Sequence, residues 1–112
     1  MSKDCKIISL NDTYDPDVPS NIDIVIYDYQ SGDWDGYGHA WYRDRNTKLW
    51  GDHCMGHCSC YGAWDHTDWS TYMTESQLIK ELSYIDIAGR NIAPEDFDYL
   101  RNMKLINAIK KC

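Results

Sequence analysis

The side chains best suited to chemistry lie in one short run, residues 53–60, with the sequence HCMGHCSC. Thiolates and imidazoles are the ligands that Zn²⁺ prefers, usually four of them in a tetrahedron. In an extended segment, Cys58 and Cys60 point the same way because they are two positions apart, so both can bind one ion. The predicted zinc-binding set is Cys54, His57, Cys58 and Cys60, with His53 and His66 as alternatives for the histidine.

The same cluster has a second interpretation as ordinary packing. Zinc ligand pairs are usually separated by about two to four residues, and the second pair usually comes from a distant part of the chain. Here every candidate is local, and Cys58 and Cys60 are separated by one residue. Cysteine also packs as a small apolar side chain. Zinc binding and core packing therefore both remain open for these thiols.

A third interpretation is nucleophilic catalysis. A neighbouring imidazolium lowers the pKa of a cysteine thiol and makes it a nucleophile. The candidate nucleophiles are Cys58 and Cys60, the candidate bases are His39, His57 and His66, and Asp52 or Asp65 would orient the base. No known catalytic signature surrounds these cysteines, and no phosphate-binding glycine loop is present. The sequence therefore predicts that the chain is not an enzyme.

The cysteine count and the N-terminus predict a cytoplasmic protein whose cysteines are free thiols or metal ligands rather than disulfides. The chain has five cysteines, an odd number, and three of them crowd into residues 54–60 rather than being spaced as a disulfide framework. Residues 1–6 have no apolar core of a secretory signal. No apolar run approaches the length of about 20 residues that spans a bilayer. We therefore expect no membrane association.

The negative charge is concentrated in the first half of the chain. The formal net charge is −7, and no basic residue occurs between Lys6 and Arg43. That interval contains Asp12, Asp15, Asp17, Asp23, Asp28, Asp33 and Asp35. Such a field repels nucleic acid and attracts basic surfaces. The charge pattern excludes direct nucleic-acid binding and favours a partner with a basic surface, although solubility alone is a sufficient reason for it.

Tryptophan is the other unusual feature. All five tryptophans lie between residues 34 and 69, and several of them must pack in the core because the chain has a single phenylalanine. Two groups nevertheless fall in segments rich in turn-forming residues, where aromatic side chains can anchor a partner protein. The predicted partner-binding residues are Asp33, Trp34 and Asp35 in one turn and Trp64, Asp65, Asp68 and Trp69 in a later loop.

Hydrophobic periodicity predicts the elements that position these residues. Apolar and polar residues alternate from Ile22, which indicates a strand with one buried face. Prolines 16 and 19 predict an irregular loop over residues 11–21, after a short strand over residues 6–10. The sequence predicts antiparallel strands over residues 22–29, 38–43 and 48–54, the last two joined by a turn at residues 45–48.

The C-terminal third changes to a helical period. Thr74 and Gln77 have the spacing of a capping box at a helix start. Leucines and isoleucines then recur at intervals of three and four residues, which predicts helices over residues 75–87 and 95–110. The chain is therefore expected to be a single α+β domain over residues 1–112, in which a small antiparallel meander precedes two C-terminal helices.

One segment resembles a known group of proteins. The run from His57 to Gly62, HCSCYG, follows an aromatic hairpin containing Trp41 and Trp50, and this combination resembles a segment of small uncharacterised bacteriophage proteins. The resemblance covers residues 24–65. The group has a proline where this chain has Ala63, and its pattern does not include residues 53 and 54. The resemblance implies a phage origin, with the host cytoplasm as location, and implies no particular activity.

These observations give three expectations for function. The leading one is a small acidic phage-type protein that binds and inhibits a host protein, such as a defence nuclease or a transcription component, in the manner of an anti-CRISPR or anti-restriction protein. The second is a zinc-stabilised structural or interaction module. The third is a thiol-dependent enzyme or redox protein.

Overall fold

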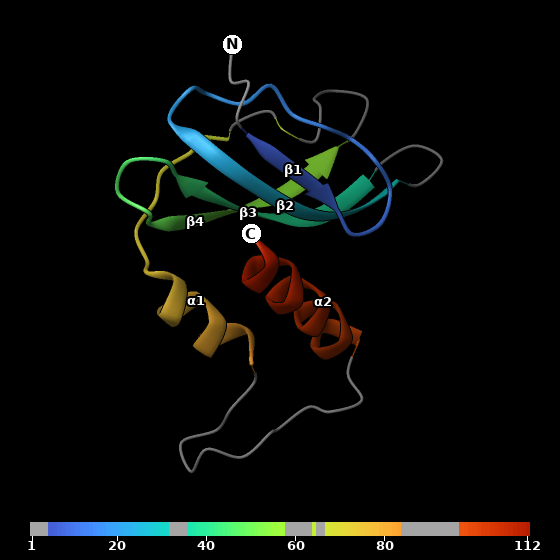
Figure 1. The fold of residues 1–112 in the computed structure, drawn as a ribbon. Coiled ribbons are helices and arrows are strands. Elements are labelled where there is room, and N and C mark those ends of the chain that lie inside the picture. Colours follow the sequence, from blue (N-terminus) through green and yellow to red (C-terminus); the bar gives the residue numbers. More distant parts are fainter. Residues whose placement is uncertain (1–4, 32–35, 58–63, 65–66, 84–96) are drawn as a thin grey trace.

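The protein folds as a four-stranded sheet with two helices on one of its faces (Figure 1). The computed structural model describes residues 5–31, 36–57, 64, 67–83 and 97–112. The elements are β1 (Lys6–Ser9), β2 (Ile22–Ser31), β3 (Gly36–Asp44), β4 (Trp50–His57), α1 (Glu75–Leu82) and α2 (Phe97–Lys111). The predicted α+β class and the order of a sheet followed by two helices are confirmed.

The sheet has the strand order β1-β2-β3-β4. The three longer strands pair antiparallel, as predicted, with Tyr27 opposite Ala40 and His39 opposite Cys54. β1 is different, because it pairs with β2 in parallel. A parallel neighbour needs a long connection that returns the chain to the starting edge. Residues 10–21 provide that connection, so the sheet is not a pure meander.

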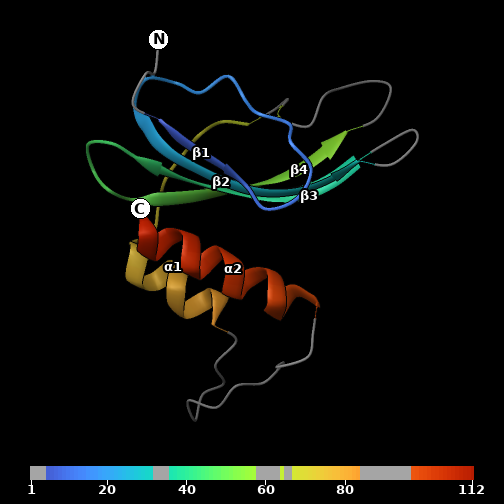
Figure 2. The same ribbon diagram turned by 45° about the vertical axis from the view of Figure 1, so that its right-hand side comes forward.

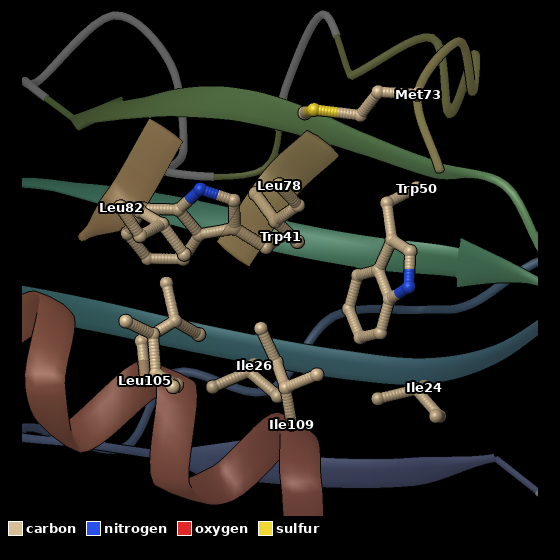
Figure 3. Packing of buried hydrophobic residues seen from close by; sticks show 10 residues of the cluster. Ile24, Ile26, Trp41, Trp50, Met73, Leu78, Leu82, Leu105 and Ile109 are labelled. Carbon is tan, nitrogen blue, oxygen red and sulfur yellow. The ribbon is translucent and has the colours of Figure 1, made fainter. Parts of the chain in front are cut away.

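Side-chain alternation divides the sheet into two covered faces. On the helix face, Ile24 and Ile26 of β2 and Trp41 of β3 pack with Leu105 and Ile109 of α2 (Figure 3). We call the opposite surface the loop face. Its buried residues are Ile22, Val25, Tyr27, Tyr29, Ala40, Tyr42 and Met55. Figure 2 shows both helices on one side of the sheet and the segment after β1 on the other.

The predicted capping box begins α1. The amide of Gln77 donates to Oγ1 of Thr74 at 3.2 Å, and the amide of Thr74 donates to Oε1 of Gln77 at 2.8 Å. The helix continues to Leu82, and the predicted residues 84–87 lie outside the described part of the chain. No helix in the described ranges is both long and apolar enough to cross a membrane.

The segment before α1 runs along the outer edge of β4. The amide of Trp50 donates to the carbonyl of Met73 at 2.7 Å, and the amide of Met73 donates back at 3.1 Å. This isolated antiparallel bridge places Tyr72 beside the residues of β4. The chain therefore connects sheet and helices through hydrogen bonds that keep residues 72–74 in place.

Candidate functional site

Two groups of side chains stand out, and the first lies on the loop face. The indole of Trp64 donates to the backbone carbonyl of Tyr14, which joins two segments fifty residues apart in sequence. The ring of Trp64 stacks on Trp69, with centroids 5.8 Å apart and an interplanar angle of 8°. Trp64 also meets Tyr27 edge-on at 5.4 Å, and Trp69 meets Tyr42 in the same way at 4.9 Å. The tryptophan pair therefore connects the sheet to the loop over residues 10–21.

Tyr27 holds that loop to the sheet. Its side chain is buried, and its hydroxyl donates to Oδ1 of Asp15 at 2.7 Å and accepts from the amide of Tyr14 at 2.6 Å. Burial, followed by the bond to the Asp15 carboxylate, raises the pKa of Tyr27 above its ordinary value. Two hydrogen bonds at one buried hydroxyl fix the path of a loop that has no secondary structure of its own.

The carboxylates of this region remain in solvent. Asp12, Asp15 and Asp17 are exposed on the loop, and Asp68 is exposed beside Trp69. Hydrogen bonds from the amide and hydroxyl of Ser70 lower the pKa of Asp68, so this carboxylate is charged at neutral pH. The loop face thus combines partly buried indole rings with exposed negative charges, and we call this set the acidic aromatic patch.

The sequence predicted partner-binding residues in one turn and in one later loop, and the structure describes only part of the loop. Trp64, Asp68 and Trp69 are in the acidic aromatic patch. Both tryptophans are partly buried and pack against the loop-face cluster, so they are tightly held side chains rather than freely exposed anchors. Asp33, Trp34, Asp35 and Asp65 lie outside the described residues. The contact of Trp64 with the loop of Asp12 to Asp17 was not anticipated from the sequence.

The second group lies on the helix face, on strand β3 and the edge strand β4. His39 and Cys54 are directly opposite each other in the sheet, and Sγ of Cys54 lies 3.6 Å from Nδ1 of His39. The other ring nitrogen, Nε2, lies 2.9 Å from Oδ2 of Asp52. The hydroxyl of Tyr72 donates to the second carboxylate oxygen of Asp52. Four side chains thus form one connected chain, Cys54–His39–Asp52–Tyr72.

The surroundings of His39 fix the plane of its ring. Its centroid lies 4.7 Å from that of Trp41, and Trp41 is 3% exposed. The guanidinium of Arg101 from α2 lies over the same indole at 5.2 Å from the ring centroid. The indole of Trp41 therefore contacts both the imidazole of His39 and the guanidinium of Arg101, and links the sheet to α2. His39 thus packs against a buried side chain, while 25% of its own side-chain surface remains accessible.

The Asp52 carboxylate acts electrostatically on the hydroxyl of Tyr72. The hydrogen bond to the Asp52 carboxylate, together with burial and the charge of that carboxylate, raises the pKa of Tyr72 well above its ordinary value. The hydroxyl therefore keeps its proton and keeps donating it to Asp52 at all physiological pH values. This bond leaves Oδ2 of Asp52 to accept from His39.

The predicted zinc site is only partly within the described chain. Cys54 is an exposed free thiol, whereas Cys58, Cys60 and the side chain of His57 lie outside the described part. Within the residues that the structure does describe, no group of three or more His, Cys, Asp or Glu side chains has a geometry that could hold a metal ion. The four-ligand zinc set remains a prediction.

The sequence indicated His39 as one of three candidate bases and Asp52 as one of two candidate orienting groups, paired with Cys58 or Cys60. The thiol that contacts His39 in the structure is that of Cys54. The signal was available in the hairpin register, because a turn at residues 45–48 that places Arg43 opposite Trp50 also places His39 opposite Cys54.

Comparison of the chain with protein-family models, curated proteins and solved structures found no match.

Proposed function

We propose that this chain is a small phage-type protein that binds a basic surface of a host protein and inhibits it. The observation that carries the proposal is a contact between two loops on one face of the sheet. The indole of Trp64 donates a hydrogen bond to the carbonyl of Tyr14. Asp12 and Asp17 are exposed in the loop that contains Tyr14, and Asp68 is exposed in the loop that contains Trp64. A surface of this kind resembles nucleic acid in charge, so it suits a defence nuclease or a transcription component as the partner.

The internal bonds of the acidic aromatic patch support a binding role. A loop that is already ordered loses less conformational entropy when it meets a partner. Here the loop is fixed by the Tyr27 hydroxyl, and the indoles of Trp64 and Trp69 are fixed by stacking. Carboxylates at the rim of such a surface mainly increase the association rate, whereas desolvated aromatic packing mainly slows dissociation. The patch contains both kinds of group.

The test is binding kinetics with the host protein that the full chain retains from a lysate. The double variant Asp12→Asn/Asp17→Asn removes two exposed charges from the loop and leaves the Asp15–Tyr27 bond intact. The matched control is Glu75→Gln/Glu81→Gln, which removes two exposed charges from α1. We expect the loop variant to associate about threefold more slowly, with a weaker salt dependence, and the control to associate at the wild-type rate.

Either of two results would contradict this function. Equal slowing by both double variants would show that net charge alone matters and that the patch is not the contact surface. Unchanged kinetics in both variants, with the fold intact by circular dichroism, would place the binding surface elsewhere on the molecule.

A further inference from the structure

We propose that Cys54, His39 and Asp52 form a nucleophilic site that accepts an acyl group from an activated carboxylic ester or thioester. The geometry is that of a nucleophile, a base and a group that orients the base. Sγ of Cys54 is 3.6 Å from Nδ1 of His39, and Nε2 of His39 is 2.9 Å from Oδ2 of Asp52. This site is separate from the acidic aromatic patch, and it departs from the sequence-based expectation that the chain is not an enzyme.

The hydrogen bonds assign a role to each nitrogen of His39. A carboxylate only accepts hydrogen bonds, so the contact with Asp52 requires a proton on Nε2. In the neutral imidazole the lone pair is then on Nδ1, the atom that faces the thiol of Cys54. Tyr72 adds a further constraint by donating to the other oxygen of Asp52. Asp52 and Tyr72 are positioning residues, whereas Cys54 and His39 contact the reacting atoms.

Within the described residues, the arrangement fits acyl transfer better than disulfide exchange. A base bonded to the sulfur is useful where a proton must leave the nucleophile and later reach a leaving group. Disulfide exchange instead needs a second thiol within reach of the first. Among the described cysteines, Cys5 packs against the cluster on the opposite face, and Cys112 follows α2. The group that touches Sγ of Cys54 is an imidazole.

The location allows a substrate to approach. Cys54 is exposed, while the side chains of His39 and Asp52 keep 25% and 33% of their surface accessible. Behind the imidazole, the buried ring of Trp41 forms an apolar floor. An apolar floor beside an accessible thiol suits a small acyl group with an uncharged leaving group.

The proposed reaction balances with water as the only co-reactant. The thiol proton passes from Cys54 to Nδ1 of His39 while Sγ forms a bond to the carbonyl carbon. The bond between that carbon and the leaving atom, oxygen in an ester or sulfur in a thioester, then breaks, and the imidazolium of His39 gives its proton to this atom. A thioester remains on Cys54. Water, deprotonated by the same imidazole, hydrolyses the thioester to a carboxylic acid and the free thiol.

The experiment treats the full chain with p-nitrophenyl acetate, quenches in acid and measures acetylation at each cysteine by peptide mass spectrometry. Cys112 is exposed and serves as an internal standard within the same molecules. We expect Cys54 to be acetylated about tenfold faster than Cys112, a conservative figure for general-base assistance. Cys54→Ser should abolish the corresponding release of p-nitrophenolate and leave the rate at Cys112 unchanged.

The variant His39→Ala separates chemistry from structure. It should lower the rate at Cys54 to that of Cys112, and added imidazole should restore the difference, which a purely structural role would not do. Asp52→Ala should shift the proton of His39 away from Nε2, as seen in the nitrogen NMR shifts of that ring, and lower the rate at Cys54 severalfold. Equal wild-type rates at Cys54 and Cys112, or a His39→Ala rate that imidazole does not raise, would overturn the proposal.

Discussion

The two faces of the sheet are covered by different physical means. The helix face is closed by aliphatic side chains of α1 and α2, and Leu105 and Ile109 among them are almost fully buried (Figure 3). The loop face is closed by segments without regular structure, held by tyrosine hydroxyls and stacked indoles. Helices satisfy their own backbone groups and need only apolar contact, whereas irregular loops need specific polar partners. The helix face should therefore respond to lost volume and the loop face to lost hydroxyls and to pH.

The largest expected effect is the loss of volume under α2. Leu105→Ala removes a fully buried side chain from the helix face, so we expect the free energy of unfolding to fall by about 3 kcal/mol. Met103→Ala changes the same helix at a position that is 38% exposed, and it should cost under about 0.5 kcal/mol. Urea denaturation measures both. Similar losses in the two variants would show that α2 does not depend on apolar burial.

The loop face should be sensitive to a single oxygen atom. Tyr27→Phe removes the acceptor of the Tyr14 amide and the donor to Asp15 while keeping the ring, so we expect a loss of about 1–2 kcal/mol. Tyr37→Phe is the control, because Tyr37 is 67% exposed and its hydroxyl donates to Gln30 in solvent. Urea denaturation of this pair tests the comparison directly. A Tyr27→Phe protein as stable as the Tyr37→Phe protein would mean that the loop is not held by this hydroxyl.

Alkaline pH should also act through the loop face. Burial, followed by the charges of Asp68 and Asp52, raises the pKa of Tyr42 to about 12. A folded pKa above the unfolded value stabilises the fold fully below pH 10, and this contribution is lost as pH rises towards 12. We expect stability to fall by about 1 kcal/mol between neutral pH and pH 11 from this tyrosine. Tyr42→Phe should be less stable at neutral pH, lacking the bond to Ser70, but should show a shallower alkaline decline.

The smallest effect is expected at a buried polar atom on the helix face. Trp50 is fully buried, and within the described residues its indole nitrogen has no hydrogen-bond partner. Trp50→Phe loses contacts but also removes this unpaired donor, so the two contributions oppose each other. We expect a net loss of under about 1 kcal/mol, well below that of Leu105→Ala, in the same urea titration. A loss of unfolding free energy as large as that of Leu105→Ala would show that removing the unpaired indole N–H does not offset the lost contacts.

Local pattern was enough for most of the elements. The strand that begins at Ile22 and the capping box at Thr74 each depend on groups a few residues apart, and both were confirmed. The single buried face predicted for that strand was wrong, because Val25 and Tyr27 are buried on the loop face, and Ile22 joins them there after a register irregularity between Ile22 and Ile24. The direction of β1 was not predictable in this way, because a short strand before a loop carries no signal of which neighbour it joins. For the site, the histidine and the aspartate could be named, but the choice among the thiols required the register of β3 with β4.

The sequence by itself determined that Ile24 and Ile26 share a face, where α1 begins and where the negative charge is concentrated, because these properties depend on spacing along the chain. Tertiary structure alone decided what covers each face. It placed the Trp64–Trp69 stack against the loop that contains Asp15. It also brought Tyr72 to Asp52, which extends the hydrogen-bonded series that begins with Cys54 and His39. Such contacts join residues far apart in sequence, and their formation depends on packing that no local pattern contains.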